Sequence, residues 1–503
     1  MKHRNLTLWF IAAFAVFRIL YVIYTPFDIS PDEAHYWEWS RRLDLSYYSK
    51  GPGVAYAIAF FSSIFGPTGI GIRIGAVIVS SISSYLVFLL GKEIFNEKAG
   101  FYGALLTNIS PIFAIGSVLM TTDVLFLFFW ISSVYFLNRA LEGKNSLWWY
   151  MAGVSIGLGF LCKYTMVLIY PSLLLMLIFS KKERVWLLDI RPYIMGLISL
   201  AAATSVIYWN IAHGQVTIKH TMGQAHLGSG TMSLWPFFEF LGAQAGLMSP
   251  LIFIALVYGV ARCAISGFRE KRSALLLLFF TGAPLFLFFL FKSLHGKVQA
   301  NWAIASYVTA FPAAAWSFEG LYSGLKGGGK GALKALAWVG IILGATATFF
   351  VYFPWMLGST GYKLISGPPY NRVTGWKELG GVVSKVKEEM DKLGPNFIAS
   401  DTYQITSELA LYVKGNPVTY NFDTGGRRMN QYDLWPGYET LSGFNAIYVR
   451  GGNEQAQEKI KASFDRCDRE VTTLHWYGNP LKEFTIFRCY NFKGMDKGTY
   501  KTY

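Results

Sequence analysis

The chain has 503 residues, of which 53% are hydrophobic, 17% aromatic and only 15% charged. Soluble domains carry charge on about a quarter of their residues, so this composition excludes an ordinary soluble protein. The formal net charge of +15 does not indicate nucleic-acid binding, because the Lys and Arg residues lie in short loops between apolar runs, as in membrane proteins. We therefore expect a polytopic α-helical membrane protein.

Apolar runs long enough to span a bilayer as helices follow one another through the first part of the chain. A spanning helix needs about 20 mostly apolar residues, and we count about eleven such runs. A further run at 53–66 is shorter and is typical of a segment that lies in the interface or re-enters the membrane. The long runs lie near residues 6–26, 68–91, 99–118, 121–140, 147–162, 165–180, 190–212, 235–262, 273–292, 300–322 and 332–357.

Positive charge alternates between the loops that join these runs. If the N-terminus is cytoplasmic, every second loop is basic and faces the cytoplasm. The first long loop, 27–66, then faces outward, and so does the chain after residue 357. We predict a multi-pass protein of the bacterial inner membrane, with a transmembrane domain over 1–357 and a periplasmic domain over 358–503.

The composition changes near residue 358, where polar residues increase and no run is long enough to span. Short strands alternate with amphipathic helices, which predicts a small soluble α/β domain. Cys467 and Cys489 would lie in an oxidising compartment, so we predict a disulfide between them, with two unpaired buried cysteines as the alternative. The expected elements are helices at 375–391 and 402–413, strands at 396–400 and 445–450, and a strand pair around 470–492.

The stretch DISPDEAHYWEWSRRLDLSYYSKGP, residues 28–52, combines acids, bases and aromatics at a density unusual in so apolar a chain. Ser30 and Pro31 favour a helix start, with Glu33 as the reciprocal capping partner of Ser30. The same helix start would hold the carboxylates of Asp32 and Glu33 rigidly at the membrane surface, where a general base is needed. The capping and the catalytic interpretation are compatible, and both stay open.

Further polar residues fall at the same outer face of the predicted bundle. Lys50 is either a snorkelling anchor or a phosphate contact, since an ammonium is a compact charge for a phosphate. An ionisable residue inside an apolar run, such as Arg18, is a functional hypothesis by default. Together these residues predict one outward cavity that binds a substrate. The candidate substrate-binding residues are Arg18, Tyr36, Lys50, Asp123, Lys163, Lys297 and Asn301.

The sequence gives little indication of a metal or nucleotide site. His213, His220 and His226 lie in one predicted outer loop, but they lack a tight metal-ligand spacing, so we expect no metal site there. No nucleotide-binding fingerprint appears in the chain. We expect no obligatory cofactor, although a divalent metal remains compatible with the site, and we expect a membrane-borne phosphate compound as substrate.

Several motifs in this chain resemble those of one known family. PDEAHYWEWS, YYSKGP, TTDVLFLFF, CKYT and QANW occur in the expected order, and SDTYQITSELALYV and NQYDLWP follow in the tail. They resemble the bacterial glycosyltransferase 39-like proteins, which stand with protein O-mannosyltransferases and lipid A aminoarabinose transferases in the polytopic GT-C class. The turn here reads KGPG where relatives often have a histidine and paired prolines, which keeps the cation but makes the turn less rigid.

The resemblance implies a sugar transferase that uses a polyprenyl-phosphate-linked donor. It implies Asp32 as the base and Lys50 as a phosphate contact, with Asp123 shaping the site, while Lys163, Lys297 and Asn301 match weaker positions. Direct displacement would invert the anomeric centre, and the acceptor hydroxyl belongs to a lipid, a glycan or a protein. The alternative is a transporter or flippase of lipid-linked glycans, which should show inverted repeats and broken helices near the membrane midplane, and we find no clear pair of these in the sequence.

Overall fold

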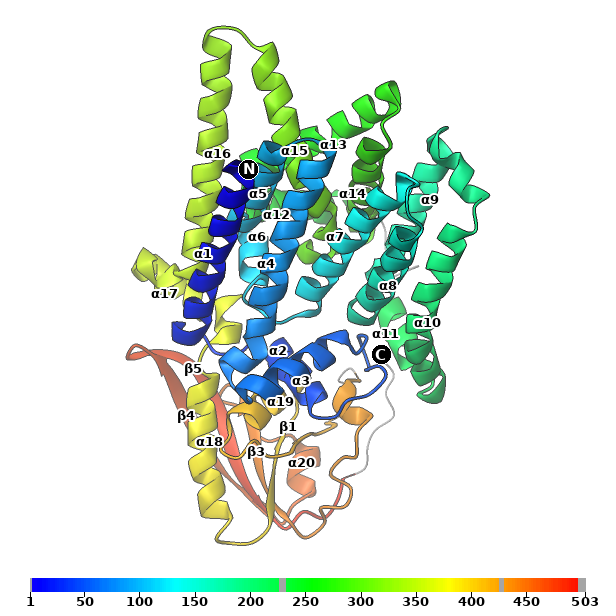
Figure 1. Ribbon diagram of the computed structural model, residues 1–503. Coiled ribbons are helices and arrows are strands. Elements are labelled where there is room, and N and C mark those ends of the chain that lie inside the picture. Colours follow the sequence, from blue (N-terminus) through cyan, green and yellow to red (C-terminus); the bar gives the residue numbers. More distant parts are fainter. Residues whose placement is uncertain (1, 226–231, 425–428, 496–503) are drawn as a thin grey trace.

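The computed structural model of the protein describes residues 2–225, 232–424 and 429–495. Long helices stand side by side in a bundle, and a smaller domain built on a β-sheet lies at one end of it (Figure 1). In these residues, seven helices are both long and apolar enough to cross a membrane. They are α1 (Lys2–Tyr24), α4 (Gly69–Ile94), α7 (Thr122–Leu141), α10 (Arg191–Ala212), α13 (Pro250–Glu270), α14 (Ser273–Lys292) and α16 (Gly328–Tyr352).

Shorter helices lie beside the long ones or at one end of the bundle. Large apolar side chains such as Leu197, Ile211 and Ile254 are exposed on its surface, which suits contact with lipid. The protein is a multi-span membrane protein, and our count of about eleven spans stays a prediction. The shorter helices are α3 (Gly53–Phe65), α5 (Glu97–Ile109), α6 (Pro111–Gly116), α8 (Leu147–Cys162), α9 (Ile169–Phe179), α11 (Val216–Ala225), α12 (Leu234–Met248) and α15 (Ala305–Gly324).

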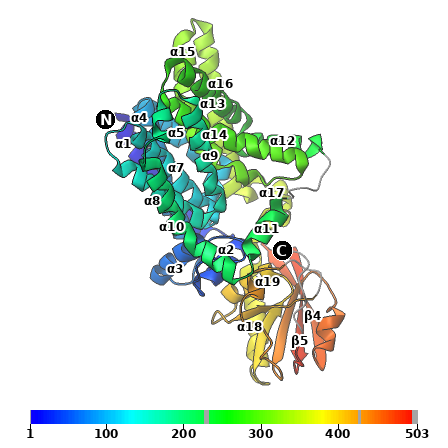
Figure 2. The same ribbon diagram turned by 90° about the vertical axis from the view of Figure 1, so that its right-hand side faces the viewer.

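Two predicted runs are each divided into two helices. The run at 235–262 breaks between α12 and α13 at Ser249, whose φ is 70°, and Pro250 then begins α13. The run at 99–118 breaks in the same way before Pro111, which begins α6. Proline lacks the N–H that an interior helical residue donates, and its ring clashes with the preceding turn, so each helix restarts there. α12 lies roughly crosswise to the long helices and projects from the side of the bundle (Figure 2).

The C-terminal domain contains one five-stranded sheet in the order β2-β1-β3-β5-β4. β1 pairs in parallel with β2 and β3, and β5 pairs antiparallel with β3 and β4. The predicted helices and strands occur within a few residues of their expected bounds, whereas the short strand β2 was not predicted. The elements are α18 (Trp376–Met390), β1 (Asn396–Ser400), α19 (Tyr403–Tyr412), β2 (Thr419–Asn421), β3 (Asn445–Gly451), α20 (Glu458–Ala462), β4 (Arg466–Trp476) and β5 (Asn479–Tyr490).

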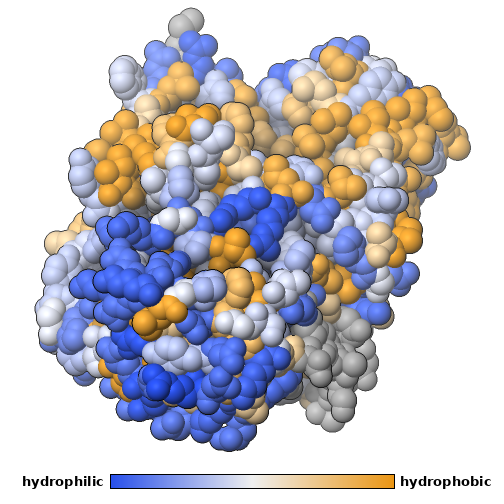
Figure 3. Space-filling view, turned by 90° about the horizontal axis from the view of Figure 1, so that it is seen from below, coloured by the Kyte–Doolittle hydropathy of each residue, from blue (hydrophilic) through white to orange (hydrophobic). Residues whose placement is uncertain are grey.

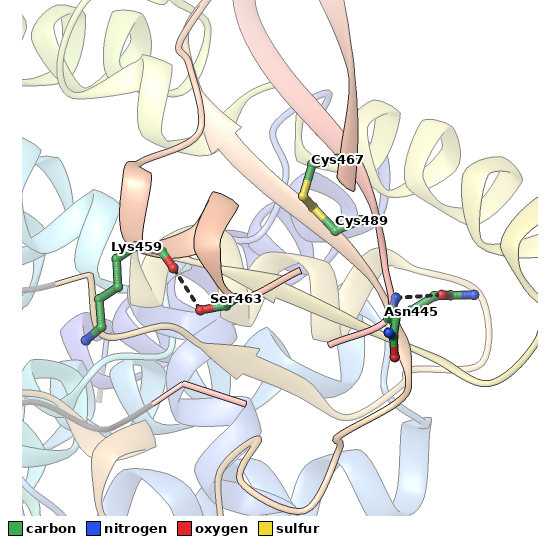
Figure 4. Close-up of a disulfide and its surroundings, with 6 residues drawn as sticks. Asn445, Lys459, Ser463, Cys467 and Cys489 are labelled. Atoms are coloured by element: carbon green, nitrogen blue, oxygen red, sulfur yellow. Dashed lines mark hydrogen bonds between the residues drawn. A yellow bond between two sulfur atoms is a disulfide. The ribbon is translucent and has the colours of Figure 1, made fainter. Parts of the chain in front are cut away.

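Both faces of this sheet are covered, because side chains alternate along each strand. Ile398 and Ile447 pack with α18 and α19 in one buried cluster, while Phe397 and Tyr448 pack with α20 in another. Cys467 and Cys489 lie directly opposite each other on β4 and β5, and the structure joins them in a disulfide (Figure 4). Hydrophilic residues gather over the outer surface of this domain, and hydrophobic ones lie beside it on the bundle (Figure 3).

Helices α2 (Pro31–Ser40) and α3 lie between the bundle and the C-terminal domain (Figures 1 and 2). The apolar side of α2, including Ala34 and Trp37, packs in one buried cluster with Ala410 and Leu411 of α19. The carboxylate of Asp28 accepts the backbone N–H of Trp376 at 2.8 Å, so it caps the N-terminus of α18 from a distant part of the chain. The loop that carries the acid pair is thus fixed on both sides.

Candidate active site

The start of α2 has the geometry that its sequence predicts. Ser30 is the N-cap, and its Oγ accepts the backbone N–H of Glu33 at 3.4 Å. The Glu33 carboxylate accepts the backbone N–H of Ser30 at 3.1 Å, which completes the capping box, and Pro31 is the first helical residue. Asp32 therefore occupies a fixed place in the first helical turn.

Glu33 is fully buried and holds this turn in place. Its carboxylate accepts hydrogen bonds from Arg73 Nε at 2.9 Å and Nη2 at 2.8 Å, and from the backbone N–H of Met120 at 2.9 Å. Burial by itself would raise the pKa of Glu33, but Arg73 and the backbone donors bring it below its ordinary value. This placement argues against the catalytic role that we expected for Glu33, because both of its oxygens are occupied and neither is exposed.

Asp32, the neighbouring residue, has the opposite environment. Its side chain is 42% exposed, so a substrate can reach it. Arg372 Nη2 lies 3.2 Å from its Oδ2, and the hydroxyl of Tyr403 donates to its Oδ1 at 3.2 Å. Burial, followed by the nearby Asp32 charge, raises the pKa of Tyr403, so this phenol stays protonated and acts as a donor. Asp32 is thus an accessible carboxylate with an arranged set of partners.

Three of the predicted residues form a second group around Asp123, in the first turn of α7. Lys163 Nζ lies 2.5 Å from Asp123 Oδ1, and Asn301 Nδ2 donates to Asp123 Oδ2 at 2.6 Å. Lys163 follows the end of α8, and Asn301 lies in η4 (Ala300–Ala303). A carboxylate also suits the positive end of a helix dipole. The structure therefore brings together residues from three distant segments.

Lys50 lies close to both groups. Its ammonium has no hydrogen bond or ion pair with any residue in the described part of the chain. Burial and the nearby charge of Lys163 lower the pKa of Lys50, while Asp123 and Asp32 act in the opposite direction. A cation with acidic and basic neighbours but no partner of its own is suited to binding an anion from outside.

Tyr36 lies one helical turn after Asp32, on the same side of α2. Burial is the main reason that the pKa of Tyr36 lies well above its ordinary value, and the charges of Asp32 and Asp123 raise it further. Its hydroxyl therefore stays protonated and can donate to a substrate. Asp32, Tyr36, Lys50, Asp123, Lys163 and Asn301 are all linked by contacts or by electrostatic interaction.

The structure does not bring two other predicted residues to this group. Lys297 pairs with Glu239 at 2.7 Å, with side chains that are 70% and 41% exposed, so it is a surface cation with its own partner. Arg18 is buried within α1, and its guanidinium lies 5.4 Å from the centre of the Phe14 ring. Neither has a contact with Asp32 in the residues that the structure describes.

The predicted histidine loop is only partly described. His213 stacks on Trp209 and His220 packs on Tyr48, whereas His226 lies outside the described residues. In the part of the chain that the structure describes, no group of three His, Cys, Asp or Glu side chains is arranged to hold a metal ion. The compatibility of the site with a divalent metal stays a prediction.

Sequence reasoning missed Arg372 and Tyr403. Tyr403 belongs to the tail motif SDTYQITSELALYV, which could have indicated a role, but nothing local distinguishes Arg372. Arg372 lies in η6 (Tyr370–Val373), just before the C-terminal domain's first helix, and Tyr403 begins α19. Both reach Asp32 only because the C-terminal domain docks onto α2.

The fold matches a solved structure along nearly the whole chain. ArnT from Cupriavidus metallidurans, solved bound to undecaprenyl phosphate, matches with a TM-score of 0.65 over 97% of this chain and 99% of that one, at 12% sequence identity. The family described as dolichyl-phosphate-mannose-protein mannosyltransferase matches residues 49–209. The resemblance inferred from the sequence motifs is therefore confirmed.

Two relatives are similar in sequence. The lipid A galacturonosyltransferase RgtD of Rhizobium johnstonii is 29% identical over 61% of this chain and 64% of its own length. The undecaprenyl phosphate-alpha-4-amino-4-deoxy-L-arabinose arabinosyl transferase 2 of Pseudomonas fluorescens is 26% identical over 37% of this chain and 36% of its own length. The chain thus spans less than two thirds of the length of each of these relatives.

Proposed function

We propose that the protein is an inverting glycosyltransferase that moves a sugar from a polyprenyl-phosphate-linked donor to a lipid hydroxyl on the periplasmic side of a bacterial inner membrane. The names of the two relatives support a glycosyl transfer, and one of them names lipid A and the other an undecaprenyl-phosphate-linked sugar. The acid-bearing loop and the C-terminal domain lie at the same end of the bundle, which suits one reaction site on one membrane face (Figure 1).

One observation carries this proposal. Lys50 has no partner of its own in the described residues, and it lies among Asp32, Asp123 and Lys163. Lys163 is already paired with Asp123 at 2.5 Å, so Lys50 is the cation that remains available for a phosphate. The accessible carboxylate of Asp32 belongs to the same group. A base and a phosphate-binding cation are the two features that transfer from a lipid phosphate requires.

The chemistry follows from these charges. Asp32 accepts the proton of the acceptor hydroxyl while the acceptor oxygen forms a bond to the anomeric carbon of the sugar. The bond between the anomeric carbon and the phosphate oxygen breaks, and the lipid phosphate leaves with one more negative charge. Lys50 stabilises this growing charge because it is already in place and largely removed from water. Attack opposite to the leaving group inverts the anomeric centre.

The test uses the purified protein in lipid nanodiscs with undecaprenyl-phosphate sugar and an extracted lipid A acceptor. A transferase releases undecaprenyl phosphate and forms a glycosylated acceptor with inverted configuration. A transporter or flippase leaves the sugar attached to its lipid phosphate and moves the intact compound across a bilayer. Absence of released undecaprenyl phosphate with any lipid, glycan or peptide acceptor would contradict the proposal.

A further inference from the structure

Both oxygens of the Asp32 carboxylate are contacted by the C-terminal domain and its preceding segment. Arg372 contacts Oδ2 and Tyr403 contacts Oδ1, each at 3.2 Å, across 340 and 371 residues of chain. In contrast, the Asp123 carboxylate takes its partners Lys163 and Asn301 from the helical bundle. The site thus has two parts. The helical bundle supplies the partners of Asp123, and the C-terminal part of the chain supplies those of Asp32.

Arg372 is held in place and does not belong to a freely moving surface arm. Its carbonyl accepts the indole N–H of Trp376 at 2.7 Å, and the carbonyl of Val373 accepts the backbone N–H of Asp28 at 2.8 Å. The Asp28 carboxylate in turn caps α18 through the backbone N–H of Trp376. The segment with Arg372 is therefore attached to the segment with Asp32 by two hydrogen bonds of Asp28, one from its backbone N–H to Val373 and one from Trp376 to its carboxylate.

Tyr403 is also fixed. Its ring packs against His35 with the ring centres 4.9 Å apart, and the hydroxyl of Ser407, one turn later in α19, donates to the carbonyl of Tyr403 at 2.7 Å. Burial and the charge of Asp32 raise the pKa of Tyr403, which keeps its proton available for the hydrogen bond. A neutral donor and a cation thus approach the two oxygens of one carboxylate from two directions.

An exposed ion pair on its own contributes little to stability, and the Arg372 side chain is 52% exposed. A base, however, acts efficiently only when its oxygen is correctly oriented, and many enzymes orient the base with a third group. We propose that Arg372 and Tyr403 are positioning residues for Asp32, so that the C-terminal domain is part of the catalytic machinery. This inference rests on the proposed role of Asp32 as the base.

The test compares the full-length variants Arg372→Gly, Arg372→Lys and Tyr403→Phe with the wild type. Arg466→Gly is the matched control, because Arg466 is a C-terminal-domain arginine that pairs with Asp468 at 3.5 Å. For Arg372→Gly we expect kcat to fall by about 10- to 100-fold, the scale of a misplaced catalytic group, with little change in KM for the donor. Added methylguanidine should restore part of the lost rate, and Arg372→Lys should retain more activity than Arg372→Gly.

A purely structural role predicts a different result. Loss of the domain contact would lower the melting temperature and would not respond to methylguanidine. Unchanged kcat in both Arg372→Gly and Tyr403→Phe, or a loss without any rescue, would overturn the inference.

A second measurement needs no sugar donor. Labelling with a water-soluble carbodiimide and an amine, followed by mass spectrometry, reports how freely the Asp32 carboxylate reacts. We expect labelling of Asp32, relative to Asp468, to rise several-fold in Arg372→Gly and Tyr403→Phe, and unchanged labelling would overturn the inference. If the wild type releases no undecaprenyl phosphate, the proposed function fails while this measurement still decides whether the two residues hold Asp32.

Discussion

Gly51 packs directly against the backbone carbonyl of Leu161 near the end of α8. A Cβ atom on Gly51 would lie 2.2 Å from that oxygen, so only glycine permits this approach. The contact places the turn that carries Lys50 beside the segment that carries Lys163. The less rigid KGPG turn is thus fixed by packing against α8.

Replacing Gly51 with alanine should therefore displace the Lys50 turn. We expect a loss of about 1–3 kcal/mol in the free energy of unfolding, as for other overpacked sites, and weaker binding of undecaprenyl phosphate. Gly116→Ala is the control, since a Cβ atom there meets no heavy atom within 4 Å. Thermal denaturation and lipid binding measure the two effects, and equal behaviour of the two variants would refute the close approach.

Lys50→Gln should weaken the binding of undecaprenyl phosphate, because it removes the cation that remains available for the phosphate. We expect the dissociation constant to rise by about tenfold or more, the scale of a charge-assisted hydrogen bond. Lys297→Gln serves as the comparison, since Lys297 already pairs with Glu239. Binding is measured by isothermal titration in detergent, and an unchanged affinity in Lys50→Gln would count against the phosphate contact.

Glu33→Gln should destabilise the protein far more than a substitution at Asp32. The change leaves Arg73 buried without its anionic partner, and breaking a buried pair in this way costs about 3–5 kcal/mol. Asp32→Asn removes a half-exposed pair and should leave the melting temperature nearly unchanged. Thermal unfolding of both variants measures the difference, and equal stabilities would show that Glu33 does not anchor α2.

The buried carboxyl of Glu408 should make the stability of the protein depend on pH. Burial is the main reason that the pKa of Glu408 lies well above its ordinary value, and the neighbours Asp28 and Glu33 raise it while Lys482 and Arg73 lower it. The folded state holds the proton of the Glu408 carboxyl more tightly than the unfolded state does. The stability that this proton contributes is therefore complete below about pH 4, the pKa of Glu in the unfolded chain, and is lost as the pH rises through the folded pKa. Ionisation of the buried carboxyl thus opposes folding at higher pH.

The substitution Glu408→Gln should remove this dependence. Above about pH 4, and until the pH passes the folded pKa of Glu408, the wild type should lose up to about 1.4 kcal/mol of stability per pH unit that the variant retains. Lys482 acts in a separate range, since burial lowers its pKa to about 8 and its deprotonation favours folding above that pH. Chemical denaturation at several pH values measures the effect, and parallel curves for the two proteins would exclude Glu408 as the cause.

Much of the fold follows from local patterns. Apolar runs predicted the long helices, and the alternation of short strands with amphipathic helices predicted β1 and α19 within one or two residues. The sequence also predicted the capping box at Ser30 and three candidate site residues, Asp32, Lys50 and Asp123. Helix starts and charges in apolar surroundings are visible in a sequence.

Contacts between distant segments could not be predicted in this way. The roles of Glu33 and Arg372 depend on Arg73 and Asp32, which lie 40 and 340 residues away from them, respectively. Lys297 matched a motif position, but its flexible exposed side chain pairs with Glu239. The docking of the C-terminal domain onto α2 determines that Arg372 meets Asp32, and the packing of the helices determines that Arg73 meets Glu33.

The most direct test of the central claim is the activity of Asp32→Asn in nanodiscs with undecaprenyl-phosphate sugar and a lipid A acceptor. Asparagine keeps the size of the side chain, but it has one acceptor oxygen in place of two and cannot accept the proton as the base. We expect the release of undecaprenyl phosphate to fall by about 100-fold or more, with normal expression and melting temperature, while Asp468→Asn stays active. Turnover by Asp32→Asn close to that of the wild type would contradict the assignment of Asp32 as the base.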